Sequence, residues 1–179
     1  KMIKFELVQD NLRQKILINR DDQINNVNII IKELRSPFQT STYKVNNSHY
    51  KKHSIVLELH DEIYNFFTKM QDQLFSFVFE NSNQIFNSQL TLDEIKNMYK
   101  SCIRKNPKYK GTIKLRLKTF TDIKKHDRVS GEIEMLNIWI SDDKSSFGFS
   151  PFLVYPIVQP PVHKPKTNSD PDVCLFLDI

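Results

Sequence analysis

The alternation of apolar and basic residues is strongest in the stretch KGTIKLRLKTF, residues 110–120. The apolar residues of this stretch are Ile113, Leu115 and Leu117. The basic residues Lys114, Arg116 and Lys118 lie between and after them. Because successive side chains of a strand point to opposite faces of a sheet, this spacing predicts a strand with one apolar and one cationic face. The apolar row needs a core. The basic row faces either a polyanion or water, since lysine and arginine are also common on solvated sheet faces.

Other stretches rich in β-branched and apolar residues predict further strands on both sides of a helical region. Before that region we expect strands at residues 2–8, 15–19, 24–34 and 54–59, with a hairpin or a loop-rich pair of strands at 38–52. After it we expect strands at residues 112–121, 131–141 and 147–158, with a turn at 142–146.

The central region changes to an apolar period of three and four residues, which is typical of helices. One helix is predicted at residues 60–80, with an apolar stripe made of Ile63, Phe66, Phe67, Met70, Leu74, Phe77 and Val78. A second helix is predicted at residues 92–105, because Thr91 and Glu94 have the spacing of a capping box and Pro107 follows.

The order of these elements predicts an α+β protein that is mainly β, with residues 1–158 as one domain. Residues 159–179 are expected to form a Pro-rich linker and a C-terminal tip.

Net charge, cysteine spacing and the lengths of apolar runs limit the classes of protein to which this chain can belong. The net charge of +5 favours one basic face on a near-neutral body, and neither glycine-rich phosphate-binding motif occurs. Cys102 and Cys174 have no metal-binding spacing and form no disulfide framework, which is typical of a reducing compartment. Since no apolar run of about 18 residues occurs, we expect a soluble protein of the cytoplasm, nucleus or viral replication site that does not contact membranes.

No catalytic or metal-binding pattern stands out. His49 and His53 are four residues apart, but no further ligand accompanies them, and Cys102 lacks the local signature of a nucleophile. Glu132 and Glu134 are the one pair of carboxylates that a two-metal nuclease could use. We therefore expect a protein that is not an enzyme and that uses neither a cofactor nor a metal.

Cations and aromatic residues gather around the basic strand, and proteins that bind unpaired nucleic-acid strands combine these two kinds of side chain. The candidate nucleic-acid-binding residues are Lys114, Arg116, Lys118, Lys124, Lys125, Arg128, Tyr109, Lys108, Lys110, Tyr43, Lys44, Tyr50, Lys52, Phe38 and Arg35. The cations would follow the phosphates, and the aromatic residues would stack on bases. Trp139 lies on a strand with apolar residues at both parities, and a core position is the favoured interpretation.

The C-terminal tip, DPDVCLFLDI, mixes acidic and apolar residues. It is either an arm that docks on its own domain or on a neighbour, or a segment that binds partner proteins. The candidate partner-binding residues are Asp170, Asp172, Phe176 and Asp178.

The layout resembles an OB-fold single-stranded-DNA-binding protein, a Greek-key barrel that would here carry a two-helix insertion and an extended C-terminal tail. A helical pair followed by GTIKLRLKTF and then GEIEMLNIWISDDKSSFGFSPFLVYPIVQ is similar to the single-stranded-DNA-binding proteins of nucleocytoplasmic large DNA viruses, of the African swine fever type. The resemblance covers roughly residues 24–158. It implies sequence-independent binding of single-stranded DNA in replication, recombination or repair, recruitment of replication proteins by the tip, and no catalytic residues.

A second class of function stays open at this stage. In a structural or assembly protein, such as a minor virion or scaffold component, the basic strand would be a packing face and the tip a docking arm. The sequence decides neither between DNA and RNA nor between a monomer and a homo-oligomer.

Overall fold

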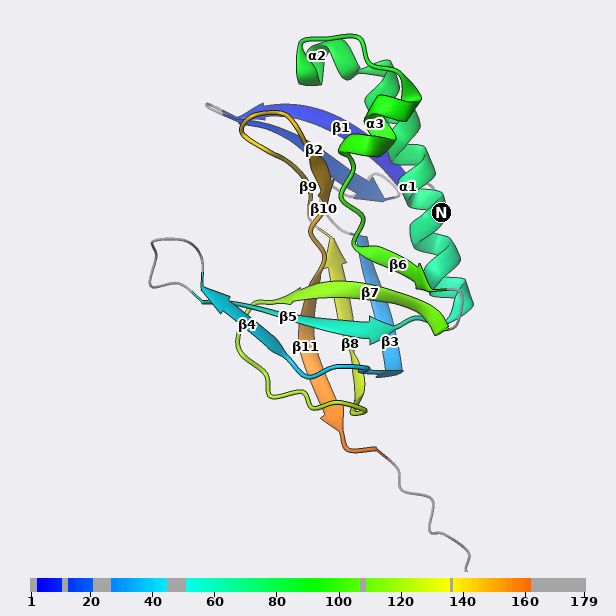
Figure 1. Cartoon of the computed structure of the whole chain (residues 1–179), viewed down its shortest axis with the longest axis vertical. Helices are drawn as coiled ribbons and strands as arrows, with labels where there is room; N and C mark the ends of the chain where they lie inside the picture. Colours follow the sequence, from blue (N-terminus) through cyan, green and yellow to red (C-terminus); the bar gives the residue numbers. More distant parts are fainter. Residues whose placement is uncertain are drawn as a thin grey trace, which may run out of the picture.

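The chain forms two sheets and three helices in the part that a computed structural model describes, namely residues 3–10, 13–20, 27–44, 51–106, 109–135 and 137–161 (Figure 1). Strands dominate, so the expected α+β class that is mainly β is confirmed.

The smaller sheet has four antiparallel strands in the order β1-β2-β9-β10. They are β1 (Ile3–Asp10), β2 (Arg13–Arg20), β9 (Asn137–Ile140) and β10 (Phe147–Phe149). The turn predicted at 142–146 joins β9 to β10 and is confirmed. Hydrogen bonds from Ser141 and Ser145 to the carboxylate of Asp143 lower its pKa to about 2.

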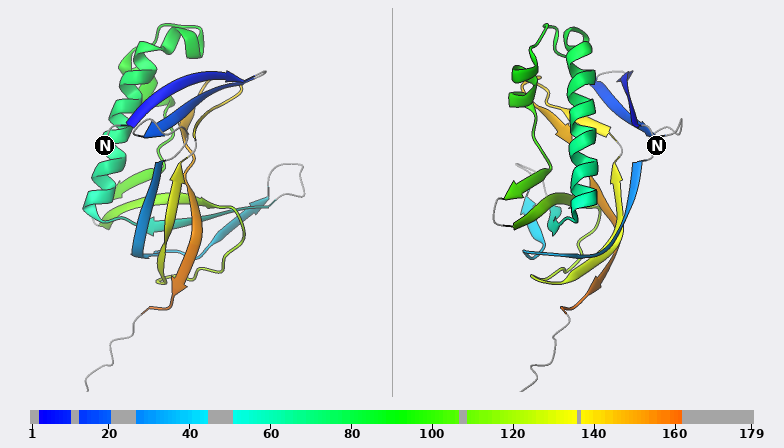
Figure 2. Two further views of the ribbon diagram at one scale, coloured as in Figure 1. Left: turned by 180° about the vertical axis from the view of Figure 1, so that it is seen from behind. Right: turned by 90° about the vertical axis from the view of Figure 1, so that its right-hand side faces the viewer.

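The larger sheet has the strand order β3-β8-β11-β7-β5-β4, and β6 pairs with β7 beside this path. Its strands are β3 (Val27–Arg35), β4 (Ser41–Lys44), β5 (Lys51–Glu58), β6 (Ile103–Asn106), β7 (Tyr109–Leu117), β8 (Arg128–Met135) and β11 (Phe152–Gln159). Strands β7 and β11 run parallel, and the other pairs are antiparallel. In Figure 1 and in the left view of Figure 2, β5 and β7 cross β3, β8 and β11 at a steep angle.

The two ends of the larger sheet approach each other. Strands β3 and β4 are consecutive in the chain but stand at opposite ends of the strand order. The segment between them is tied to the β7–β8 loop, since the amides of Ser36 and Thr40 donate to the carbonyls of Asp127 and Ile123, each at 2.9 Å. The Ser36 hydroxyl also donates to the Val56 carbonyl on β5 at 3.3 Å. The sheet therefore curls, but the ladders among the described strands do not return from β4 to β3 and form no closed barrel.

Two bulges flank β8. Its register with β3 shifts between Ile31 and Leu34, and its register with β11 shifts between Val154 and Ile157. Each bulge contains a residue in the left-handed region, Glu33 with a φ of 49° and Tyr155 with a φ of 51°. Because bulges increase the local twist and bend of a strand, they bend β3 and β11 where these strands pair with β8.

The predicted alternation in β7 is confirmed. Ile113 and Leu115 are fully buried and Leu117 is 6% exposed, whereas the basic residues between and after them lie on the opposite face. The buried row packs with apolar residues from β5, β8 and β11, among them Leu57, Ile133 and Leu153.

Helix α1 (Asp61–Glu80) runs along one side of the molecule and packs against β7 and β1 (Figure 1). At its lower end the ring of Tyr64 covers Gly111 on β7, where a Cβ would collide with that ring. At its upper end Phe77 packs against Phe5 of β1, with ring centroids 5.8 Å apart. The helix predicted at 60–80 is thus confirmed, and it joins the two sheets.

The second predicted helix is confirmed at its start and wrong at its end. Helix α3 (Leu92–Met98) starts with the expected capping box, in which the amide of Thr91 donates to the Glu94 carboxylate at 2.8 Å. It ends at Met98, because Tyr99 turns to an extended conformation and buries its ring against Phe75 and Phe147. Residues 103–106 form β6 instead, and a short helix, α2 (Ser82–Phe86), follows α1 directly.

Two of the predicted long strands are each two strands in different sheets. Residues 131–141 divide into the end of β8 and β9, and residues 147–158 divide into β10 and β11. The strand expected at 112–121 ends at Leu117, and within 38–52 the described strands are β4 and the start of β5. Trp139 is only partly buried and lies opposite Gly148, whereas its neighbour Ile138 is fully buried, so the core interpretation of Trp139 is wrong.

The orientation of β7 predicts that two neighbouring substitutions affect stability to very different extents. Leu115→Ala removes a fully buried side chain and should lower the free energy of unfolding by about 2–5 kcal/mol. Lys114→Ala changes an exposed side chain and should change it by less than about 0.5 kcal/mol. Urea denaturation followed by circular dichroism measures both. Equal losses for the two variants would contradict the described faces of the strand.

The packing of Cys102 predicts low thiol reactivity. This residue precedes β6, its carbonyl accepts from the amide of Lys114 at 2.8 Å, and burial raises the pKa of its thiol to about 12. In a Cys174→Ser variant at pH 8, Ellman's reagent should therefore react at least about tenfold more slowly with the folded chain than with the urea-unfolded chain, because little thiolate is present. Similar rates in the two states would show that this segment does not pack as described.

Candidate nucleic-acid interface

The basic row of β7 lies on the outer face of the larger sheet. Lys114 and Lys118 are exposed, and Arg116 is partly buried. Across the ladder on β5, Lys114 faces Val56 and Arg116 faces Ser54. Neither neighbour is charged, and Glu58, the carboxylate two positions further along this face of β5, is engaged by Arg35.

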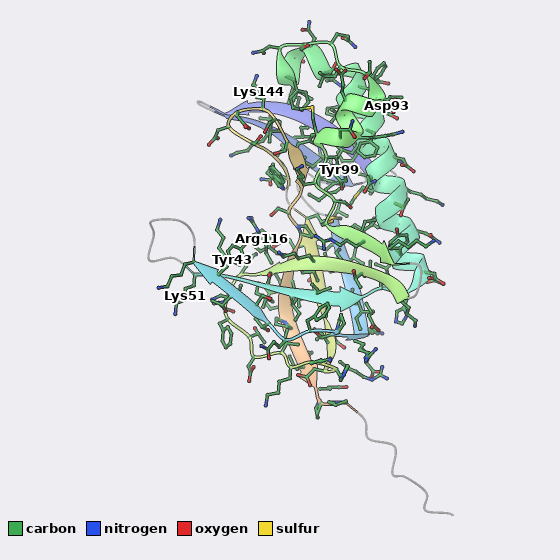
Figure 3. The ribbon with its side chains drawn as sticks, in the orientation of Figure 1. Tyr43, Lys51, Asp93, Tyr99, Arg116 and Lys144 are labelled. Carbon is green, nitrogen blue, oxygen red and sulfur yellow. The ribbon has the colours of Figure 1, made fainter. Side chains whose placement is uncertain are left out.

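Two aromatic rings lie against this row. The Nζ of Lys114 is 5.9 Å from the centroid of the Tyr43 ring on β4. On the other side, the Phe152 ring of β11 is 5.8 Å from the Arg116 guanidinium and 6.0 Å from the Lys118 Nζ. These distances are within the range of cation–π contacts. Figure 3 shows the labelled side chains of Tyr43 and Arg116 in the same part of the face, with Lys51 farther out along β5.

The row and its rings form the surface that we call the basic–aromatic face, consisting of Tyr43, Lys52, Lys114, Arg116, Lys118 and Phe152. Lys52 belongs to it because it is exposed and pairs with Tyr43 across the β4–β5 ladder. Of the sequence-predicted residues, the structure therefore brings five together, and Phe152 joins them.

Acidic residues border this face on the side of β8. Glu134 pairs with Phe152 in the ladder, and its carboxylate accepts from the Lys118 Nζ at 2.6 Å. Glu132 pairs with Val154 on the same side. Among the described residues, neither Lys114 nor Arg116 has an acidic partner, so the positive charge is least compensated in the middle of the face.

A second group of candidate cations lies elsewhere. Arg128 pairs with Gln159 and Arg35 at the far end of β8, six residues along that strand from Glu134. At about 3.3 Å per residue this separation is about 20 Å. Lys124 and Lys125 are exposed on the loop that leads to Arg128. Along β8 the candidate cations therefore fall into two groups, and their binding of one common ligand stays a prediction.

Arg35 belongs to this second group. Its guanidinium donates to the Glu58 carboxylate at 3.1 Å and lies 2.7 Å from the His126 Nδ1, so its charge is compensated. Phe38, which is 59% exposed, lies on the segment between β3 and β4.

The remaining candidate nucleic-acid-binding residues either lie outside the basic–aromatic face or are not described by the structure. Lys110 is exposed at the start of β7 and has the parity of the basic row, whereas Lys44 is exposed on β4 next to Tyr43 and therefore points to the opposite face. Lys108, Tyr50 and the side chain of Tyr109 lie outside the described residues, and so does the whole tip with Asp170, Asp172, Phe176 and Asp178.

Sequence reasoning missed Phe152 as a site residue and Tyr155 as an exposed one. Tyr155 is 82% exposed and stands near Ile157, which is 62% exposed, on the outer side of β11. Alternation along the run PFLVYPIV could have placed Phe152 on the face opposite Leu153. Tyr155 has the same parity as Leu153 and is exposed because of the bulge in β11.

Other kinds of site find no support in the described part of the chain. No group of three or more His, Cys, Asp or Glu side chains is placed to hold a metal ion there. Glu134, one of the two carboxylates considered for a nuclease, is engaged by Lys118. Among the helices that the structure describes, none has the length and apolarity that crossing a membrane requires.

The function of this surface must be argued from its own residues. In comparisons with known proteins, no family model, no curated protein and no solved structure matches the chain. What the geometry offers is a row of cations for binding phosphates and flanking rings on which planar groups can stack.

Proposed function

We propose that this protein binds single-stranded nucleic acid independently of sequence, with single-stranded DNA as the expected ligand. The single observation that carries the proposal is the basic–aromatic face, where Lys114, Arg116 and Lys118 have aromatic rings within 6.0 Å. Proteins that bind unpaired strands without sequence preference combine cations along the backbone with rings under the bases.

Each part of the face has a role in this proposal. The three cations neutralise phosphates and release counterions, which contributes about −0.7 per contact to the slope of log affinity against log salt, or about −2 for all three. Tyr43 and Phe152 each stack on a base, which stabilises the complex by about 1–3 kcal/mol. Glu132 and Glu134 repel phosphates on the β8 side, so the strand follows β7 rather than spreading over the whole sheet.

The strand order also supports an OB-type fold for the larger sheet. Residues 27–44, taken as one bent strand, pair with β8 at one end and with β5 at the other, which gives five strands with β5, β7, β8 and β11. An OB fold is a partly open five-stranded Greek-key barrel in which the face of strands 2 and 3 binds oligonucleotides. In that order strands 2 and 3 are β5 and β7, which include the basic row.

A structural or assembly role is the second candidate. It is favoured by the exposed apolar residues Ile30 (74%), Tyr155 (82%) and Ile157 (62%) on β3 and β11, because exposed apolar patches often mark protein contacts. In that case the basic–aromatic face would bind a protein, and the replication, recombination or repair roles implied by the resemblance would not apply.

Charge reversal on the face tests the proposal. Lys114→Glu/Arg116→Glu should weaken binding to fluorescein-labelled oligo-dT at least about tenfold and reduce the salt slope by about 1.4, because two phosphate contacts are lost. Fluorescence anisotropy over a salt series measures both, and circular dichroism checks the fold.

The matched control is Lys69→Glu/Lys96→Glu, which changes the net charge equally at exposed positions on α1 and α3. It should bind nearly as well as the unaltered chain. If the two double variants lose affinity equally, only the overall charge matters. If the unaltered chain does not bind, the assembly role is favoured.

Glu134→Gln should have the opposite effect. It frees the Lys118 Nζ from its 2.6 Å partner and removes a negative charge beside Phe152. Affinity for oligo-dT at low salt should rise several-fold, and the salt slope should become steeper by about 0.7, since one more phosphate contact forms. Unchanged affinity and slope in the same anisotropy assay would place the bound strand away from Lys118.

A further inference from the structure

A hollow of about 270 Å³ opens beside Lys118, where the two parallel strands of the larger sheet separate. The ladder between β7 and β11 consists of Arg116 with Phe152 and Leu117 with Leu153. Beyond it, β11 continues along β8, whereas the chain after Leu117 enters the β7–β8 loop. The hollow lies between the separating segments, and its lining includes Lys118, Thr119, Thr121, Val154, Tyr155 and Pro156.

Tyr155 in this lining has two unusual properties. Its side chain is 82% exposed, and its φ of 51° lies in the left-handed region. A bulky residue in that region costs about 1–3 kcal/mol and persists where the surrounding structure enforces it, often at binding sites. Since an exposed ring contributes little to the core, packing does not explain a tyrosine here.

We propose that the hollow receives one unpaired base of the strand held by the basic–aromatic face, with Tyr155 as its stacking partner. This inference rests on the proposed function. Tyr155 offers a flat apolar ring with one polar end, which suits stacking against a base at a solvated site. The hollow is just below the range of about 300–1,000 Å³ typical of pockets for drug-sized ligands, so it has room for one base.

The polar lining is consistent with binding that ignores sequence. The hydroxyl groups of Thr119 and Thr121 can each donate or accept a hydrogen bond, so they can serve the edge of any base. A site for one particular base would need donors and acceptors in a fixed arrangement.

The hollow is also continuous with the face. Lys118 belongs to both, and its Nζ is 6.0 Å from the Phe152 ring, which in turn lies 5.8 Å from the Arg116 guanidinium. A strand that passes from Tyr43 over Lys114 and Arg116 therefore reaches the hollow next. The phosphate next to the inserted base would lie within reach of Lys118.

An abasic scan tests this assignment. The shortest labelled oligo-dT that binds the full chain is prepared with a single abasic site at each position in turn. An abasic site opposite any one of Tyr43, Phe152 and Tyr155 should weaken binding about tenfold, which corresponds to the loss of one stacked base. In Tyr155→Gly one of these positions should lose its effect, and the others should keep theirs.

Tyr155→Gly separates binding from folding. Because glycine adopts a positive φ without strain, this variant should be as stable as the unaltered chain or more stable. Tyr155→Asn is the second variant, since asparagine also tolerates this conformation. Tyr155→Phe keeps the ring and should keep the abasic profile. Phe120→Ala removes an aromatic residue that is 58% exposed on the neighbouring loop, and it should also leave the profile unchanged.

The outcomes distinguish this inference from the proposed function. An abasic profile that is the same in Tyr155→Gly as in the unaltered chain overturns the base-binding hollow. If Lys114→Glu/Arg116→Glu still weakens binding in that case, the proposed function stands and the hollow is assigned to a protein contact. If the unaltered chain binds no oligonucleotide, both are overturned.

Discussion

Burial of the apolar row of β7 is the constraint on which both the sheet and its outer surface depend. Ile113 and Leu115 are fully buried, so the strand cannot turn over without moving Lys114 and Arg116 into the core. Burying an unpaired charge is far more costly than exposing an apolar side chain. The positively charged face is therefore a consequence of core packing, and whatever stabilises the fold also fixes the direction in which these cations point.

Local patterns predicted the elements whose signals are local. The alternation in β7, the stripe on α1 and the capping pair Thr91 and Glu94 each depend on residues within one element, and each is confirmed. Where a long-range contact decides, the pattern was misleading. Tyr99 ends α3 because its ring is buried against β10, and a periodicity of three and four residues contains no information about that partner.

Local patterns also could not predict all the residues that make up the basic–aromatic face. Arg128 is close to Lys118 in sequence, but the β7–β8 loop takes it to the far end of β8. Tyr43 and Phe152 are distant in sequence from Lys114, yet the strand order β11-β7-β5-β4 brings them to it. Spacing along one strand could therefore identify the cations. Knowledge of which strands are neighbours was needed to identify the rings and the opposing Glu134.

The two bulges beside β8 have a consequence for how the length of this chain can vary. In a regular strand, two residues an odd number of positions apart point to opposite faces. Leu153 and Val158 are five positions apart and Ile31 and Leu34 are three apart, yet both residues of each pair pack toward the core. In each case the bulge takes up the extra residue. Loss of one residue there would restore a regular ladder and leave every later side chain on its own face, whereas the same loss elsewhere in either strand would reverse them all. Natural variants of this sequence that are one residue shorter within β3 or β11 should accordingly lack a residue near Glu33 or Tyr155.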